Sequence, residues 1–372
     1  MYKEFIDPIL MKMNSEVWHT RAREALHLAE TTPLTLKLLE QFGDAHHRLH
    51  DARLNVEVGG VRFDNPVIVG AGWDKAGRAV KGLYTLGFSG VEVGTVVEHP
   101  QEGNPAPRQF MLAPGVTLNR LGFNSPGMEA VARNLQRYRG SGIPVGISLG
   151  KNREVAAQDA PQAHAVVAEK LYDAAAYFAI NVSSPNTPGL RALQDKGPLT
   201  DIVQAVNAAM EKRGGKKPLF VKIAPELSEE AVNDVIEVVL EHGLTGIIAA
   251  NTTINQEIKA KYGERWRNEA GGVSGDDAEY RRMATEKVAY VYRQTQGKLA
   301  IMGVGGVKDA KTALEKIRAG AAIVQVVTGI RGEGTALPGR INREIVSYME
   351  KEGIKYIDEL IGVDCDKKLS HL

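Results

Sequence analysis

The densest polar chemistry in this chain lies in residues 181–190, which read Asn-Val-Ser-Ser-Pro-Asn-Thr-Pro-Gly-Leu. The apolar run before them, which begins at Tyr177, predicts a buried strand, and the prolines and the glycine stop any helix or strand from continuing. The amides and hydroxyls of this loop suit the polar edges of a small ring. An ordinary turn is the alternative for such a loop alone. Other strand ends with similar groups would favour a site.

Similar loops follow other apolar runs. Residues 70–77 resemble a dinucleotide-binding fingerprint but carry Lys75 where the third glycine should stand. This suggests close backbone approach to a ligand beside one fixed positive charge, with a solvated turn lysine as the alternative. Asn119 and Asn124 lie next to Phe123, a grouping that suits a flat heterocycle, although the spacing favours a helix cap for Asn124.

Two further features indicate a phosphate-bearing, electron-rich cofactor. Lys222 lies between apolar neighbours within a predicted strand, where its charge is costly unless it meets an anion, and such a cofactor would supply one. Glycine-rich segments at 303–306 and 328–329 follow the last two predicted strands. In barrels of alternating strands and helices, these loops form the recurring phosphate site.

The elements that position these loops repeat as strand followed by helix. Each predicted strand is short and apolar on both faces, as parallel strands covered by helices must be. We therefore predict an α/β fold, a (β/α)8 TIM barrel with an N-terminal helical extension; an open doubly wound sheet is the alternative. The predicted strands span 66–71, 90–95, 144–149, 177–182, 219–224, 246–250, 299–304 and 321–327, with amphipathic helices such as 229–241 and 311–318 between them.

The predicted domain boundaries follow from changes in pattern. Residues 1–43 read as three short helices, about 5–13, 15–30 and 34–42, which pack on the main domain or rest on a membrane surface. Residues 44–362 form the barrel, and a hairpin around Gly59-Gly60 within 54–63 is expected to cover one end of its core. Residues 363–372 read as a polar C-terminal tail.

Composition excludes several function classes. The chain has 372 residues, with 46 Lys and Arg against 45 Asp and Glu, so nothing indicates a nucleic-acid partner. The single cysteine, Cys365, rules out internal disulfides and cysteine-ligated clusters. No residues have metal-ligand spacing, so we expect no metal, and the loops lack the carboxylate pair of a glycosidase. Amides, hydroxyls and two lysines instead suit removal of a hydride from an oxidisable ring.

From the N-terminal helices to about Arg331, the chain resembles the dihydroorotate dehydrogenase family, specifically its membrane-associated, quinone-linked class. Serine rather than cysteine at position 184 separates it from the soluble classes. The resemblance rests on eight segments in order, namely 71–75 (Ala-Gly-Trp-Asp-Lys), 91–95 (Val-Glu-Val-Gly-Thr), 119–124 (Asn-Arg-Leu-Gly-Phe-Asn), 181–190, 221–225 (Val-Lys-Ile-Ala-Pro), 251–253 (Asn-Thr-Thr), 272–275 (Gly-Val-Ser-Gly) and 303–306 (Gly-Val-Gly-Gly).

The resemblance implies FMN as cofactor and oxidation of dihydroorotate to orotate in pyrimidine synthesis. Ser184 then matches the catalytic base, with Thr187 near its proton relay, and Lys222 matches the lysine beside the flavin ring. The implied substrate-binding residues are Lys75, Asn119, Arg120, Leu121, Gly122, Phe123, Asn181, Asn186, Asn251 and Thr252. The implied FMN-binding residues are Ala71, Gly72, Lys75, Thr95, Ser148, Asn181, Lys222, Ala250, Gly275, Gly306, Val327 and Thr328.

Some positions depart from the family pattern. Ser148 and Ala250 stand where asparagine and threonine usually contact FMN, which removes hydrogen bonds of about 1 kcal/mol each. Met111 and Val327 replace an arginine and a tyrosine that usually face the quinone, whereas His19 of that tunnel remains. A more apolar tunnel could favour a different quinone.

The leading hypothesis is therefore a peripheral membrane enzyme, on the cytoplasmic side of the cell membrane if bacterial, that passes electrons from dihydroorotate to a membrane quinone. It contacts the membrane through its N-terminal helices and binds no nucleic acid. A related FMN barrel oxidoreductase with another acceptor or pyrimidine is one alternative. A non-catalytic binding protein whose flavin site has decayed is another.

Overall fold

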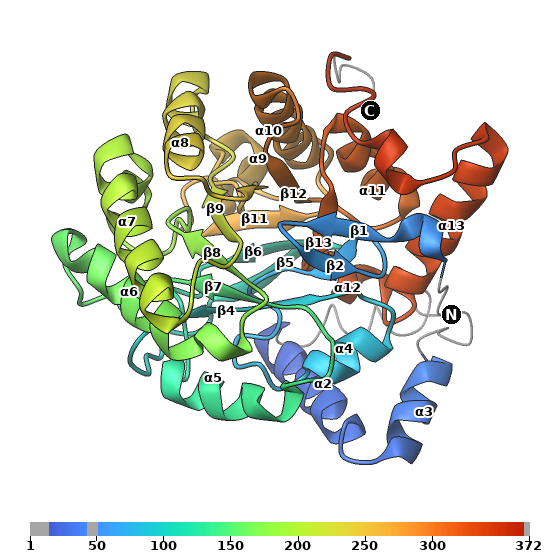
Figure 1. Cartoon of the computed structure of the whole chain (residues 1–372), viewed down its shortest axis with the longest axis horizontal. Helices are drawn as coiled ribbons and strands as arrows, with labels where there is room; N and C mark the ends of the chain where they lie inside the picture. Colours follow the sequence, from blue (N-terminus) through green and yellow to red (C-terminus); the bar gives the residue numbers. More distant parts are fainter. Residues whose placement is uncertain (1–14, 43–50, 368–372) are drawn as a thin grey trace.

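Eight parallel strands close into a barrel in a computed structural model that describes residues 15–42 and 51–367 (Figure 1). Each strand pairs with two neighbours in the order β10-β12-β13-β3-β4-β7-β8-β9. All eight strands predicted from the sequence are present, so the predicted barrel is confirmed and the open sheet is wrong. The strands are β3 (Val67–Val69), β4 (Val91–Val96), β7 (Val145–Leu149), β8 (Tyr177–Asn181), β9 (Leu219–Ile223), β10 (Gly246–Ala249), β12 (Ala300–Val304) and β13 (Ile323–Val326).

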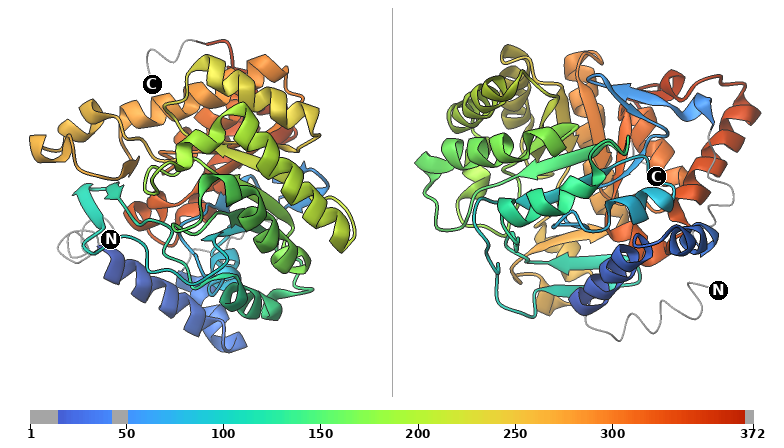
Figure 2. Two further views of the ribbon diagram at one scale, coloured as in Figure 1. Left: turned by 90° about the vertical axis from the view of Figure 1, so that its left-hand side faces the viewer. Right: turned by 60° about the horizontal axis from the view of Figure 1, so that its bottom comes forward.

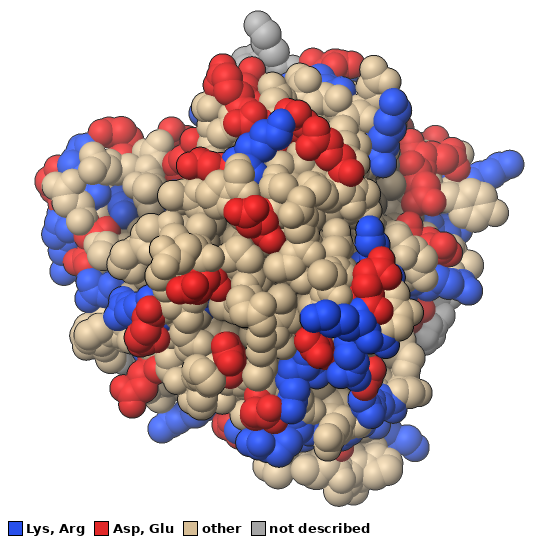
Figure 3. Space-filling view, turned by 60° about the vertical axis from the view of Figure 1, so that its left-hand side comes forward, with Lys and Arg blue, Asp and Glu red and all other residues tan. Residues whose placement is uncertain are grey.

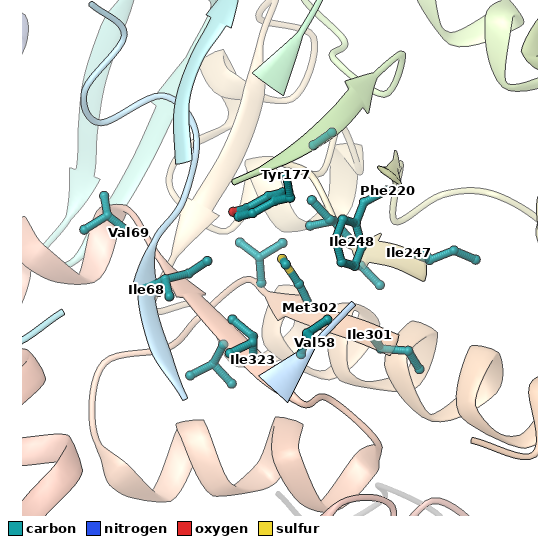
Figure 4. Close-up of a cluster of buried hydrophobic side chains, with 14 of the residues drawn as sticks. Val58, Ile68, Val69, Tyr177, Phe220, Ile247, Ile248, Ile301, Met302 and Ile323 are labelled. Atoms are coloured by element: carbon teal, nitrogen blue, oxygen red, sulfur yellow. The ribbon is translucent and has the colours of Figure 1, made fainter. Parts of the chain in front are cut away.

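The barrel strands are buried on both faces, which explains their continuous apolar runs. Inside the barrel, the rings of Tyr177 and Phe220 meet edge to face with centroids 5.5 Å apart. Figure 4 shows these two rings beside Met302 and Ile68, with the hydroxyl of Tyr177 pointing into the interior. The interior is therefore filled by side chains and is not a pore.

Helices surround the barrel as each strand returns to the next. Helix α8 shows why they form: Ser228 caps its first turn by accepting from the Ala231 amide, and Val232, Val235 and Val239 recur on its buried face. The outer helices are α4 (Val80–Thr85), α5 (Met128–Leu135), α6 (Ala160–Leu171), α7 (Lys196–Arg213), α8 (Glu229–Glu241), α10 (Ala278–Thr295), α11 (Ala310–Ala319) and α13 (Leu337–Glu352), with the short α9 (Gln256–Ala260) and α12 (Thr328–Glu333) in loops.

The predicted hairpin is confirmed, and it closes the amino-terminal end of the barrel. Strands β1 (Val56–Val58) and β2 (Val61–Phe63) pair antiparallel, and Val58 and Phe63 are buried. Gly59 lies against Pro218 and Thr245, which immediately precede two barrel strands. This end is therefore plugged, and only the carboxyl ends of the strands are left to form a site.

A second, three-stranded antiparallel sheet stands over that open end. It consists of β5 (Gln109–Ala113), β6 (Val116–Asn119) and β11 (Gly272–Gly275), in the order β11-β6-β5. A small separate core around Leu118, Trp266 and Tyr280 supports it. The long loop after β4 thus supplies two strands of this sheet and the segment after β10 supplies the third, and the sheet walls one side of the barrel mouth.

Helices α2 (Ser15–Ala29) and α3 (Pro33–Phe42) lie together along one edge of the barrel (Figure 2). They confirm the second and third helices predicted at the N-terminus, whereas the helix predicted at about 5–13 lies outside the described residues. Polar contacts fasten α2 to the barrel: Glu16 pairs with Arg108 at 2.6 Å, and Glu30 accepts from the Gly82 amide at 2.6 Å.

The described part of the C-terminal segment also packs on the barrel. The Asp364 amide donates to the Arg318 carbonyl at 2.8 Å, and the Asp364 carboxylate pairs with the Arg318 guanidinium at 2.6 Å. Cys365, partly buried, is a free thiol. Residues 363–367 are thus attached to α11, which the polar composition of this segment did not predict.

Close strand packing generates a stability prediction. A Cβ added at Gly246 would lie 1.8 Å from the Ala300 carbonyl oxygen, so β10 and β12 would have to separate. We expect Gly246→Ala to lower the free energy of unfolding by about 1–3 kcal/mol in urea titrations. Gly197→Ala, at an exposed position of α7 with no atom within 4 Å, is the matched control and should be neutral. Equal effects of the two substitutions would contradict the prediction.

Candidate active site

A cavity of about 610 Å³ opens at the carboxyl ends of the barrel strands. Its walls come from the loops after the strands, from the three-stranded sheet and from α2. Ser184, Lys75 and Lys222, which lie far apart in the sequence, all line it. The predicted site residues that line the cavity are Ala71, Gly72, Lys75, Thr95, Asn119, Leu121, Gly122, Phe123, Asn181, Ser184, Asn186, Lys222, Ala250, Asn251, Thr252, Gly275, Gly306, Val327 and Thr328.

Two predicted site residues do not line the cavity. The guanidinium of Arg120 pairs with Glu269 and lies 5.2 Å from the centroid of the Phe110 ring, so its side chain supports the sheet rather than the cavity. Ser148 is fully buried behind the wall, and its hydroxyl lies 2.9 Å from that of Thr95. Neither side chain faces the cavity, and the assignment of these two residues as ligand contacts stays a prediction.

The loop that begins at Asn181 places its polar groups by hydrogen bonds across the barrel mouth. The Asn181 amide donates to the Thr95 hydroxyl at 2.7 Å, and the Asn251 amide donates to Ser183 at 3.0 Å. Ser184 is buried, and its hydroxyl oxygen accepts from the Asn186 backbone amide at 3.3 Å. Its hydroxyl proton has no fixed acceptor among these contacts, so it can turn toward a ligand.

Arg191 holds three loop segments together from outside this network. Its guanidinium donates to the Ser183 carbonyl at 3.0 Å and to the Thr252 carbonyl at 3.2 Å, and it pairs with Glu226 at 2.9 Å. The loops after β8, β9 and β10 are therefore tied by one planar cation. This role is not predictable from the sequence, because Glu226 and Thr252 are far from Arg191 along the chain.

Lys75 reaches the cavity wall with its ammonium bonded to the Asn124 side-chain carbonyl. The predicted cap is wrong: α5 begins after Gly127, so Asn124 lies before the cap position, and its side chain accepts from Lys75 instead. Burial and then the nearby Arg108 lower the pKa of Lys75 to about 7. A bound anion would offset both causes, so this lysine suits a carboxylate ligand.

Lys222 lies inside the barrel, as predicted, but its anionic partner is a residue of the chain. Its ammonium nitrogen is 3.8 Å from Oε1 of Glu92, and it donates to Gln325 at 3.4 Å. Burial lowers the pKa of Lys222, and Glu92 partly opposes that shift. The sequence predicts an anionic partner for Lys222 and offers a cofactor as its source, and the described partner is Glu92.

Glycines line the cavity at the end of β11 and in the loop after β12. Gly275 has a φ of +99° and Gly306 a φ of +76°, and a Cβ on Gly275 would lie 2.8 Å from Thr328. The hydroxyls of Ser274 and Thr328 are 2.9 Å apart. Glycine here permits close backbone approach to a ligand, as a phosphate group requires.

Helix α2 closes the other end of the cavity. Trp18 and His19 line it, and His19 bonds the Trp73 carbonyl at 2.7 Å. Burial lowers the pKa of His19 to about 4, so its imidazole is neutral at pH 7. Arg331 also lines this end, with its guanidinium 5.5 Å from the Trp18 ring centroid. Val327 lines the cavity, whereas Met111 does not and contacts Thr117 instead.

Sequence reasoning missed several residues of this site. Glu92 belongs to the segment 91–95 and Gln325 to the predicted strand 321–327, but the sequence analysis assigns neither residue a role in the site. An ionisable residue inside an otherwise apolar strand indicates a buried functional group, and this criterion would have identified Glu92 as well as Lys222. Trp18 and Arg331 carried no comparable signal because their place in the cavity depends on how α2 docks.

The described ranges contain neither a candidate metal cluster nor a helix that could span a bilayer. Among residues 15–42 and 51–367, no group of three or more His, Cys, Asp or Glu side chains gathers as a metal site. No helix in those ranges is long and apolar enough to cross a bilayer.

Comparison with known proteins decides the family. The family model described as Dihydroorotate dehydrogenase matches residues 53–349. The chain belongs to the dihydroorotate dehydrogenase family. The resemblance inferred from the motifs is thereby confirmed.

Relatives of the family cover nearly the whole chain. One is the dihydroorotate dehydrogenase (quinone) of Anaeromyxobacter dehalogenans strain 2CP-1, 39% identical over 96% of this chain and 95% of its own length. The enzyme of the same name from Chloroflexus aurantiacus is 41% identical over 93% and 96%. A crystal structure of DHODH from Eimeria tenella in complex with ferulenol has a TM-score of 0.80 at 32% identity, covering 90% of this chain and 95% of that one.

Proposed function

We propose that this chain is an FMN-dependent dihydroorotate dehydrogenase that oxidises (S)-dihydroorotate to orotate and passes the electrons to a membrane quinone in pyrimidine synthesis. The observation that carries the proposal is one shared cavity for Ser184, Lys75 and Lys222. Full-length similarity to enzymes named dihydroorotate dehydrogenase (quinone) supports it. The related oxidoreductase and the decayed binding protein find no specific support in the cavity.

The substrate half of the cavity offers polar atoms that no protein group satisfies. Among the described residues, the buried Asn186 Oδ1 and Thr252 Oγ1 lack a hydrogen-bond partner. Unsatisfied buried groups are costly, so these atoms favour a ligand with matching polar edges. The side-chain nitrogen of Asn186 donates to the side-chain oxygen of Asn119 at 3.3 Å, and both residues line the cavity. Lys75 then binds the carboxylate of the ring.

The cofactor half fits a phosphate-bearing flat ring. Lys222 and Thr95 would lie beside the ring, and the backbone around Gly275, Gly306 and Thr328 would hold the phosphate. FMN, when bound, supplies the hydride acceptor. The Ser184 hydroxyl would take the proton from the adjacent ring carbon as the hydride leaves and would release its own proton to the relay expected near the buried Thr187.

The residues that depart from the family pattern lie in or directly behind the cavity wall. Ser148 bonds Thr95 and so holds the residue that faces the ring, although it does not face the cavity itself. Ala250 and Val327 line the cavity with apolar atoms, so FMN receives fewer hydrogen bonds from these positions. The quinone would approach from the end formed by Trp18, His19 and Val327.

Flavin reduction tests the proposal directly. The purified protein should be yellow, or become yellow with FMN, and should bleach without oxygen when dihydroorotate is added. Ser184→Ala should lower the flavin-reduction rate by about two orders of magnitude or more at pH 7, because no other group lies in its place to accept the proton. Orotate binding should be nearly unchanged, since Ser184 makes no charged contact.

Ser183→Ala is the matched control for the serine substitution. Ser183 is equally buried but bonds Asn181 and Asn251 and does not line the cavity. It should slow the reaction far less than Ser184→Ala. A folded protein that cannot be loaded with FMN would refute the proposal.

Protonation of Lys75 generates a pH prediction. Its pKa of about 7 means that the ammonium form prevails below pH 7 and the neutral amine above it. A carboxylate binds the ammonium form, so the dissociation constant of orotate should be flat below pH 7 and rise by up to about tenfold per pH unit above it. Fluorescence titrations from pH 6 to 9 measure this.

Two variants test the origin of that pH dependence. Lys75→Met should bind orotate weakly at every pH and abolish the rise. Lys81→Met, at an exposed lysine of α4, should leave the curve unchanged. A rise that persists in Lys75→Met would assign the titration to another group.

The N-terminal helices are proposed to rest on a membrane surface. Leu28, Leu34 and Leu38 of α2 and α3 are 67%, 69% and 45% exposed, and no described residue covers them. Figure 3 shows a group of Lys and Arg side chains at the lower right of one face, with both charge signs interspersed elsewhere. Helices that expose apolar side chains can lie on a lipid surface without spanning it.

Vesicle binding tests this surface. Because each buried leucine contributes roughly 1.5–3 kcal/mol, Leu28→Glu combined with Leu34→Glu should lower partitioning of the full chain into anionic vesicles by about tenfold or more. Leu240→Glu, on the exposed face of α8, is the matched control and should have no effect. A chain that starts at residue 44 should not sediment with vesicles, and equal binding of all variants would contradict the proposal.

A further inference from the structure

A buried carboxylate lies under the cavity and has no part in the mechanism proposed above. Glu92 projects from β4 into the barrel and is fully buried. Its Oε2 accepts from the Gln325 amide at 2.7 Å and from the Tyr177 hydroxyl at 3.1 Å. Its Oε1 has no hydrogen-bond partner among the described residues and lies 3.8 Å from the ammonium of Lys222.

The fold makes room for this arrangement. A Cβ on Gly146 would lie 2.1 Å from Cζ of Tyr177 and 2.4 Å from its hydroxyl oxygen. A Cβ on Gly70 would lie 3.0 Å from the side-chain oxygen of Gln325. Two glycines, one in β7 and one directly after β3, lie on the two strands that flank β4 and leave space for the two side chains that donate to Glu92. The carboxylate is held in place from two sides.

Its partners also connect it with the cavity. Gln325 lines the cavity, and its side-chain oxygen accepts from Lys222 at 3.4 Å while its nitrogen donates to Glu92. The Lys222 ammonium is therefore fixed between an amide oxygen and a carboxylate that lies deeper in the barrel. Charges so close together, and away from water, act strongly on one another and on a ring bound above them.

We propose that Glu92 is a positioning residue for Lys222, which fixes its ammonium under the flavin ring and offsets its charge, and thereby holds down the reduction potential of the bound flavin. The inference rests on the proposed function. A flavin ring gains negative charge on reduction, so a lone lysine cation below it would favour the reduced form. The carboxylate of Glu92 opposes that effect.

The reduction potential of the FMN-loaded full chain tests the inference. Glu92→Gln keeps the shape of the side chain and removes its charge. We expect the reduced form to be favoured at least tenfold more than in the parent protein, a rise of about 30 mV for a two-electron couple. Glu98→Gln, on the loop after β4 and outside the cavity, is the matched control and should leave the potential unchanged.

A purely structural role of Glu92 predicts another result. In that case Glu92→Gln lowers the unfolding midpoint but leaves the potential of the bound flavin unchanged, and the inference is overturned. If Glu92→Gln retains no flavin, Glu92→Asp decides, because it keeps the charge but moves it away from Lys222. Glu92→Asp should then favour the reduced form by less than tenfold, which is a rise of less than about 30 mV in the reduction potential. An unchanged potential would overturn the inference.

The same experiment separates this inference from the proposed function. A parent protein that binds no flavin would overturn both. A parent protein that binds flavin and is reduced by dihydroorotate, with a potential that does not respond to either Glu92 substitution, would overturn the inference alone.

Discussion

Closure of the parallel barrel determines where polar and charged side chains can lie in this molecule. Both faces of each strand are buried and both edges are paired, so polar side chains are stable only at the carboxyl ends or in satisfied networks inside. The hairpin β1–β2 plugs the amino-terminal end. Charge inside the barrel therefore has to be balanced there, and Glu92 balances Lys222 with the help of Tyr177 and Gln325.

This constraint explains how much the sequence predicts. Apolar runs that are buried on both faces are recognisable without any tertiary contact, so all eight strands could be found. Because the carboxyl ends of barrel strands meet at one mouth, residues as distant as Lys75 and Asn251 could be assigned to one site from their position after a strand. The family resemblance then gave these positions particular roles, which local pattern alone does not assign.

The sequence could not predict contacts that compete with local rules. Asn124 was predicted to cap a helix, but α5 begins only after Gly127, and the Asn124 side chain bonds Lys75 instead. Arg120 belongs to a matched motif, yet Glu269 draws its guanidinium to the outside of the sheet. In both cases a partner distant in the chain outweighs the neighbours. Pairings of this kind are decided by packing, which a single sequence does not contain.

One side of helix α2 lines the cavity, and its opposite side exposes an apolar residue. Its inner side supplies Trp18 and His19 to the cavity, and ionic contacts such as Glu16 with Arg108 hold it there rather than a broad apolar interface. Its apolar Leu28 is left outward with the leucines of α3. A surface that covers those leucines would therefore contact the same helix that forms one wall of the cavity. Under the proposed function, access for an apolar electron acceptor and contact with lipid would both involve α2, which is also tied to the barrel core through the buried Leu26.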